Sequence, residues 1–229
     1  MSELQQLAKP LLSNQIDAAI NFSKEELGGL EYKDIVLLKK VFPKHQVAVL
    51  VKAIVVNALY RTFIFDILKV ASCVERMLMT THSSGPDLVE EMVVAIGQIT
   101  QQKNYSFASK YAHFFIDSDL PVLDTYAEWM VSKHLGAMKS KNPKRYLKFT
   151  EDIETLKRLA GLTCSCAELD AYLWVAGEYL SWKVNSKLNI SGDLRHHFER
   201  LEKDPESERN LQNLLGDDVQ APRNLTTVI

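Results

Sequence analysis

The chain has 229 residues, of which 46% are hydrophobic and 24% are charged, so it is long enough to bury a sizeable core. Its formal net charge of -2 argues against a protein that coats nucleic acid through bulk positive charge, although a local basic face is compatible with it. The longest apolar stretches carry charged side chains, such as Lys52, Arg61 and Asp66, so none of them predicts a membrane span.

The N-terminal stretch MSELQQLAKPLLSNQ lacks the apolar core of a signal peptide, so we expect a soluble cytoplasmic protein. Cys73, Cys164 and Cys166 fit a reducing compartment. Cys164 and Cys166 are separated by one residue, and no second pair of Cys or His has the spacing of metal ligands. The sequence therefore predicts neither a metal site nor an organic cofactor.

The segments in the first half of the chain are predicted to be helical. Ser23 and Glu26 have the spacing of a capping box, which predicts that a helix begins at Ser23. The apolar run 44–80 is too long for one ordinary helix, so we expect a break near Tyr60–Thr62. Pro86 suits the first turn of the next helix. The apolar face of that helix would consist of Leu88, Met92, Val93, Ile96 and Ile99.

The middle of the chain is predicted to be a helix, a short loop and a second helix. The first helix covers about 106–116 and is followed by the loop DSDLP. Asp124 begins the second helix and Gly136 ends it.

The remaining segments continue the helical pattern. Helices are predicted at about 150–160 and at 166–186, the second opening with the capping box SCAE. Another amphipathic helix is SGDLRHHFERLE, and DPESERNLQNLLG adds a short one. No segment shows the alternation typical of a strand. We therefore expect an all-α fold of about ten helices, with a single domain over 1–215 and a disordered tail over 216–229.

Lys110 and Asp124 lie on the two sides of one short predicted loop. An amine that attacks a sugar carbon must lose its proton near neutral pH, and burial among apolar groups such as Phe107 favours the neutral form. The cation-like transition state also requires a fixed carboxylate, which a helix N-terminus would keep ionised at Asp124. Two alternatives stay open: Lys110 extends its amine to solvent, and Asp124 only caps its helix.

The stretch SKYAHFFIDSDLPVLDTYAEWMV resembles the core of the helix–hairpin–helix DNA glycosylase superfamily. Members of that superfamily have a Lys-x-Ala helix, a loop, and a Val/Leu-Asp-x-His/Tyr start to the next helix. AYLWVAGEYL, residues 171–180, is similar to the late family helix that packs behind the catalytic aspartate. SFASKY…P…D also looks like the same stretch in uncharacterised bacterial helical proteins. The matching positions in this chain are Lys110, Ala112, Pro121, Val122, Leu123, Asp124 and Tyr126.

The resemblance implies two packed helical lobes with a cleft between them, and the activity of a base-excision DNA glycosylase with or without abasic-site lyase activity. The partner would be duplex DNA with a damaged or modified base flipped out of the stack. Lys110 would be the amine nucleophile and Asp124 the essential carboxylate. His113, three residues after Lys110, is a candidate proton shuttle, and a structural histidine is the alternative.

Two features depart from the superfamily pattern. The Gly-x-Gly hairpin turn that holds DNA phosphate is replaced by YSFAS, residues 105–109, which contains no glycine. The spacing from Lys110 to Asp124 is 14 residues, which is a few shorter than usual for the superfamily. The alternative function is therefore a catalytically inactive helical module that keeps the fold and binds nucleic acid or a protein partner.

A basic run, KHLGAMKSKNPKRYLK over 133–148, contains five lysines, one arginine and no acidic residue. Such runs are often solvated faces, but beside an active cleft this one would contact DNA phosphates. The candidate phosphate-binding residues are Lys139, Lys141, Lys144 and Arg145.

Overall fold

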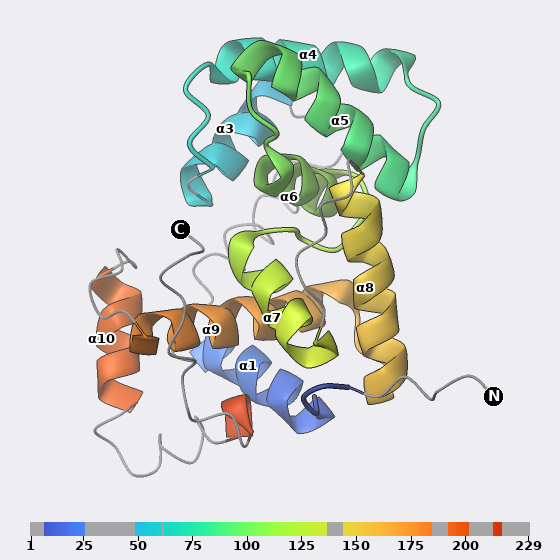
Figure 1. Cartoon of the computed structure of the whole chain (residues 1–229). Coiled ribbons are helices and arrows are strands. Elements are labelled where there is room, and N and C mark those ends of the chain that lie inside the picture. Colours follow the sequence, from blue (N-terminus) through green and yellow to red (C-terminus); the bar gives the residue numbers. More distant parts are fainter. Residues whose placement is uncertain are drawn as a thin grey trace, which may run out of the picture. The chain divides into compact units, whose positions relative to one another are not determined.

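The computed structural model describes residues 7–25, 49–60, 62–136, 144–184, 192–201 and 213–216 (Figure 1). No described residue lies in a β-strand, which confirms the predicted all-α class. No described helix combines the length and apolar character needed to cross a bilayer. The described helices of ten or more residues are α1 (Ser13–Glu25), α3 (Val49–Leu59), α4 (Ile67–Thr80), α5 (Gly85–Thr100), α6 (Tyr105–Phe115), α7 (Thr125–Leu135), α8 (Arg145–Ala160), α9 (Cys166–Val184) and α10 (Gly192–Leu201).

The chain divides into two compact units, each assembled from segments that are distant in the sequence. The first unit contains α1, α9, α10, nearly all of α7 and the last residues of α8. The second unit contains α3, α4, α5, α6 and the first part of α8. Apart from Gly216, the predicted tail over 216–229 lies outside the described residues.

In the second unit, α4 and α6 each pack against both α3 and α5. This arrangement buries the apolar stripe that the sequence predicted on α5, except that Ile99 is only half-buried. The loop before α7 also contributes apolar side chains to this core. The buried residues of the second unit include Val56, Val70, Val74, Leu88, Met92, Val93, Ile96, Phe107, Tyr111, Leu120, Val122, Leu123 and Phe149.

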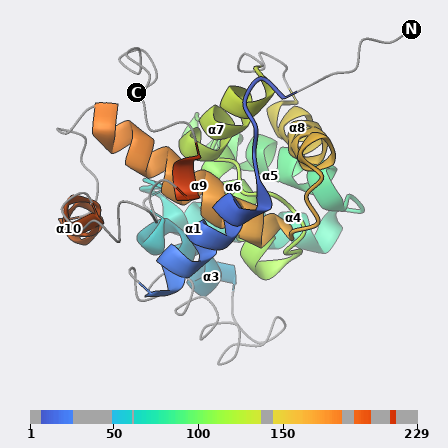
Figure 2. The same cartoon turned by 90° about the horizontal axis from the view of Figure 1, so that it is seen from below.

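In the first unit, α1 lies along α9, as both views of the molecule show (Figures 1 and 2). Gly177 of α9 packs directly on α7, because a Cβ atom at this position would lie 2.8 Å from the Cβ of Tyr126. The segment 171–180 therefore contacts the first turn of α7. Phe198 of α10 completes the core through ring contacts with Phe22, Tyr179 and Trp182.

The residues before α1 are bound to the end of α7. The amide of Ala8 donates to the carbonyl oxygen of His134 at 2.8 Å, and His134 Nδ1 lies 3.1 Å from the carbonyl oxygen of Lys9. The hydroxyl of Tyr172 lies 2.9 Å from His134 Nε2. Gly136 follows with φ of +69°, so it ends α7 in the left-handed conformation that the sequence predicted for it.

Several predicted helix boundaries are confirmed. The apolar run 44–80 is interrupted between α3 and α4, and Pro86 lies in the first turn of α5. The predicted capping box before α9 is formed reciprocally. The Ser165 amide donates to Glu168 Oε2 at 2.8 Å, and the Glu168 amide donates to Ser165 Oγ at 3.2 Å.

The predicted helix start at Ser23 is wrong, because this residue lies near the end of α1. The helix begins at Ser13, and Ile16, Ala19 and Phe22 are buried at helical spacing. The helical spacing of these three residues is hard to recognise in the sequence, because the segment is short and many of its other residues are polar. Burial of one face against α9, rather than a local capping motif, decides where this helix lies.

Candidate functional site

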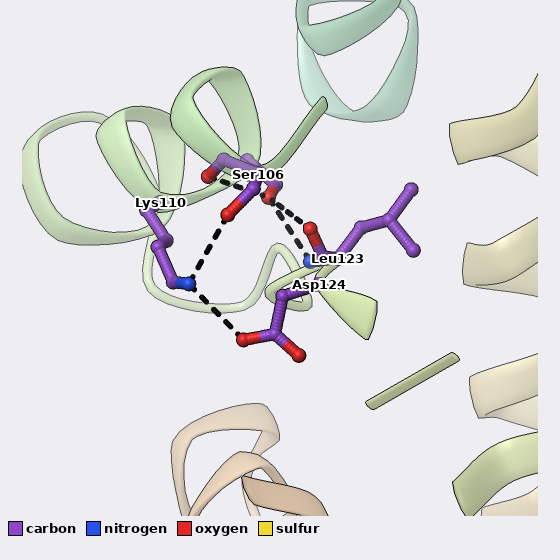
Figure 3. Close-up of polar contacts among 5 residues, drawn as sticks. Ser106, Lys110, Leu123 and Asp124 are labelled. Atoms are coloured by element: carbon purple, nitrogen blue, oxygen red, sulfur yellow. Dashed lines mark hydrogen bonds and ion pairs between the residues drawn. The ribbon is translucent and has the colours of Figure 1, made fainter. Parts of the chain in front are cut away.

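Lys110 and Asp124 form an ion pair in the second unit. Lys110 Nζ lies 3.0 Å from Asp124 Oδ2 and 3.2 Å from Ser106 Oγ, one helical turn earlier on α6 (Figure 3). Only 9% of the Lys110 side chain and 14% of the Asp124 side chain are exposed. The two residues that the sequence singled out are therefore in direct contact and largely shielded from water. Lys110 does not extend its amine freely into solvent.

Ser109 holds the segment of Asp124 against α6. The Leu123 amide donates to Ser109 Oγ at 3.0 Å, and the same hydroxyl lies 3.3 Å from the Leu123 carbonyl oxygen. Ser109 is fully buried. Since Ser109 precedes Lys110 and Leu123 precedes Asp124, this contact sets the distance between amine and carboxylate. No sequence pattern points to Ser109, and only its position next to Lys110 could have suggested it.

His113 lies one turn further along α6 and is also buried. Its Nδ1 atom lies 2.7 Å from the carbonyl oxygen of Leu120. A carbonyl can only accept, so Nδ1 carries the proton and donates it to this loop. The contact supports the structural reading of His113, because it holds the loop before Asp124 on α6. The proton-shuttle role stays a prediction.

The loop between α3 and α4 carries two exposed phenylalanines, Phe63 and Phe65. Asn57 holds this loop, because its side chain donates to the Ile64 carbonyl at 3.0 Å and accepts from the Ile64 amide at 2.9 Å. Asn57 is thus a satisfied polar group. Phe63 has a φ of 54°, which is unusual for a bulky residue, and it is 75% exposed. Phe65 is 98% exposed.

A buried carboxylate, Glu90 of α5, determines where α8 begins. Its Oε1 atom accepts from the Tyr146 amide at 2.6 Å and from the Leu147 amide at 3.3 Å. Its Oε2 atom lies 3.2 Å from the hydroxyl of Tyr105. Burial, and then the charge of Glu90, raise the pKa of Tyr105 above its ordinary value of 10.0. The helix expected over about 150–160 begins earlier, at Arg145, where Glu90 binds the backbone amides of its first turn.

The structure describes only part of the basic run over 133–148. Lys139 and Lys141 lie outside the described residues. Lys144 is exposed, and its Nζ atom lies 3.8 Å from Asp87 Oδ1. The guanidinium of Arg145 lies over the ring of Tyr105, with its Cζ atom 5.4 Å from the ring centroid. Lys144 and Arg145 thus each contact a side chain of α5 or α6. A DNA phosphate would have to displace these contacts or bind beside them.

The turn between α5 and α6 differs from the sequence interpretation. Residues 105–109, which were taken to replace the Gly-x-Gly turn, lie in the first turns of α6. The turn itself is 101–104 and also lacks glycine. Gln101 adopts the left-handed conformation with φ of 58°, and Asn104 Nδ2 donates to Thr100 Oγ1 at 2.8 Å and to the Gln102 carbonyl at 3.1 Å. Side-chain hydrogen bonds therefore shape this turn.

Chemically, the site offers a shielded amine beside a carboxylate, which is the pair that imine formation at a sugar carbon requires. Among the residues that the structure describes, no three His, Cys, Asp or Glu side chains are grouped as metal ligands would be.

Comparisons with known proteins match only part of the chain. Residues 22–119 match the HI_0787_N family model, which describes an N-terminal domain. An uncharacterized protein of Haemophilus influenzae is 31% identical over 97 residues, which cover 38% of this chain and 46% of that protein. The chain thus spans less than half the length of the curated relative that it matches. No solved structure matches the chain.

Proposed function

We propose that this chain is a DNA glycosylase of the helix–hairpin–helix type with abasic-site lyase activity. The observation that carries the proposal is the contact of 3.0 Å between Lys110 Nζ and Asp124 Oδ2. The sequence resemblance assigned these two residues as nucleophile and carboxylate, and they come from segments separated by a loop. The contact supports the proposal because an amine and a carboxylate at this distance can act on the same sugar carbon.

The reaction would use both side chains. Lys110 attacks C1′ of the deoxyribose in its neutral form, after its ammonium proton has passed to solvent. The bond from C1′ to the base breaks, and the departing base keeps the electron pair and takes up a proton. Asp124 stays ionised and balances the positive charge that develops on the sugar. Opening of the sugar ring then leaves an imine between Lys110 and C1′.

Borohydride trapping tests this proposal. Duplex DNA with an abasic site should form a covalent complex with the full chain, because only an imine between an amine and the sugar is reduced to a stable bond. Lys110→Gln should abolish the complex. Lys52→Gln is a matched control, because Lys52 is another buried lysine, located on α3. Trapping that persists in Lys110→Gln, or its absence in the unmodified chain, would contradict the proposal.

Base release tests the second residue. Asp124→Asn should slow release by about 10²–10³-fold, because a neutral amide cannot balance the charge on the sugar. A panel of duplexes carrying different damaged or modified bases would be needed to find the substrate. Removal of a base would be detected as cleavage of the strand at the abasic site that it leaves.

The second candidate is a catalytically inactive module in which the ion pair only fixes the loop before α7. The low exposure of both side chains favours this candidate, because a substrate would have to displace their present contacts. It predicts DNA or protein binding without any trapped complex. Trapping therefore separates the two candidates directly.

A further inference from the structure

The loop between α6 and α7 is held by side chains on two different helices. Two side chains of α6 bind its backbone, one at the Leu120 carbonyl and one at the Leu123 amide. From α8, the hydroxyl of Tyr146 donates to the carbonyl oxygen of Pro121 at 2.8 Å. All three contacts fall within the four residues before Asp124, so they act on the backbone that carries the candidate carboxylate.

The contact from α8 restricts a movement that the contacts from α6 permit. Two hydrogen bonds to one helix define a line along that helix, and a loop fixed at two points on a line can still turn about it. The start of α8 lies beside α6, where the Arg145 guanidinium covers the Tyr105 ring (Figure 1). The Tyr146 hydroxyl is therefore a third point of attachment away from this line, and it fixes the direction in which Asp124 faces.

Both ends of this contact are held firmly. Tyr146 is fully buried, and its amide donates to Oε1 of Glu90 on α5 at 2.6 Å. On the other side, the ring of Pro121 fixes its own φ, and all of 120–123 is buried. A displacement of the Pro121 carbonyl would therefore be passed along the backbone to Asp124, three residues later.

We propose that Tyr146 is a positioning residue, which sets the Asp124 carboxylate beside Lys110 by holding the Pro121 carbonyl. This inference rests on the proposed function, to which it adds a residue of α8. When the Lys110 amine adds to C1′ of an abasic site and water leaves, the protonated imine carries a positive charge. A carboxylate displaced by about 1 Å would stabilise this charge less, and such a displacement can cost about 10²-fold in rate.

Borohydride trapping at a series of DNA concentrations tests this role. Tyr146→Phe keeps the buried ring and removes the donor to Pro121. At saturating concentrations of duplex DNA with an abasic site, the trapping rate should fall by about 10- to 100-fold. The DNA concentration that gives the half-maximal rate should stay unchanged, because Tyr146 is fully buried and acts on the reaction rather than on DNA binding.

Tyr172→Phe is the matched control. It removes another buried tyrosine hydroxyl, which lies on α9 at 2.9 Å from His134 Nε2. It should lower the free energy of unfolding, as Tyr146→Phe does, but leave the trapping rate unchanged. Should Tyr146→Phe be unstable, trimethylamine N-oxide added to all variants alike favours their folded states. Equal rates in the two variants, or a change only in the half-maximal DNA concentration, would contradict the inference and leave the proposed function standing.

A measurement without DNA tests the geometric part alone. A double-mutant cycle of Lys110→Met and Asp124→Asn, followed by urea denaturation, gives the coupling between these two side chains. This coupling should be smaller in the Tyr146→Phe background than in the Tyr172→Phe background. An unchanged coupling overturns the inference whether or not the chain acts on DNA. If the coupling falls but the unmodified chain traps nothing, the proposed function fails and the inference fails with it.

Discussion

The buried hydroxyl of Ser109 binds the backbone of Leu123 and thereby sets Asp124 beside Lys110. The hydroxyl accepts from the Leu123 amide at 3.0 Å, across 14 residues of chain. This single contact connects α6 to the loop before α7. It is the tertiary feature on which the geometry of the candidate site depends.

Replacement of this serine should therefore affect both folding and the site. Ser109→Ala leaves the Leu123 amide without its acceptor in a buried position, so the free energy of unfolding should fall by about 1–3 kcal/mol. Urea denaturation measures this loss. Ser106→Ala is the control, because Ser106 is half-buried and bonds the amine rather than the loop. Equal losses in both variants would contradict the role of Ser109 given above.

The ion pair between Lys110 and Asp124 should show energetic coupling. Asp124→Asn retains a good helix cap but leaves the shielded ammonium without its charged partner, so it should destabilise the native state. In a Lys110→Met background the same change should cost much less. A double-mutant cycle should give a coupling free energy of about 1–3 kcal/mol. A coupling near zero would mean that Asp124 acts on stability as a cap alone.

The buried tyrosines should make stability fall at alkaline pH. Burial, and then the charge of Glu75, raise the pKa of Tyr111 above its ordinary value of 10.0. The folded state keeps Tyr111 protonated where the unfolded chain has already lost the proton. The stabilisation is therefore complete below about pH 10 and is lost progressively above it. Tyr105 contributes in the same direction.

Denaturation curves between about pH 8 and 12, the range around the tyrosine titration, would check this behaviour. Tyr111→Phe should flatten the alkaline decline in stability. Phe107→Leu is the control, since it alters a neighbouring buried ring of α6 and should lower stability by the same amount at every pH. An alkaline decline that Tyr111→Phe leaves unchanged would show that Tyr111 does not cause it.

The conformation of Phe63 predicts that glycine is tolerated there. The left-handed backbone costs a bulky residue about 1–2 kcal/mol, and glycine costs about 0.5–1 kcal/mol in chain entropy. Phe63→Gly should therefore leave the free energy of unfolding unchanged or raise it by up to about 1 kcal/mol. Phe65→Gly is the matched control, because Phe65 is similarly exposed but has no positive φ, and it should destabilise. A marked loss for Phe63→Gly would mean that its ring contributes contacts to the fold.

Salt dependence tests the basic run. If Lys139, Lys141, Lys144 and Arg145 contact phosphates, affinity for duplex DNA should fall steeply with salt, with a log–log slope of about -0.9 per phosphate neutralised. Replacing all four with serine should flatten this slope for every DNA sequence alike. Lys69→Ser, on α4 and paired with Asp66, is a control that should leave the slope unchanged. An unaltered slope in the fourfold variant would identify the basic run as a solvated face.

Local patterns in the sequence were sufficient for the helical class and for most helix ends. The capping box at Ser165, Pro86 in the first turn of α5, and the left-handed Gly136 all act through their immediate neighbours. Such short-range effects depend on residue type and spacing, so the order of residues alone reveals them. Lys110 and Asp124 were also singled out, from their chemistry on the two sides of one short loop and from resemblance to a family.

Only the tertiary structure decided the features that depend on contacts between residues far apart in the chain. Glu90 determines the start of α8 by binding backbone amides that lie far along the chain, such as that of Tyr146, 56 residues later. Ser109 reaches Leu123, and Tyr60, which directly follows α3, reaches Lys110 of α6. No local pattern distinguishes these residues from an ordinary surface glutamate, serine or tyrosine. Their roles arise because folding buries each polar group beside one specific partner, and an unpaired buried polar group would be costly.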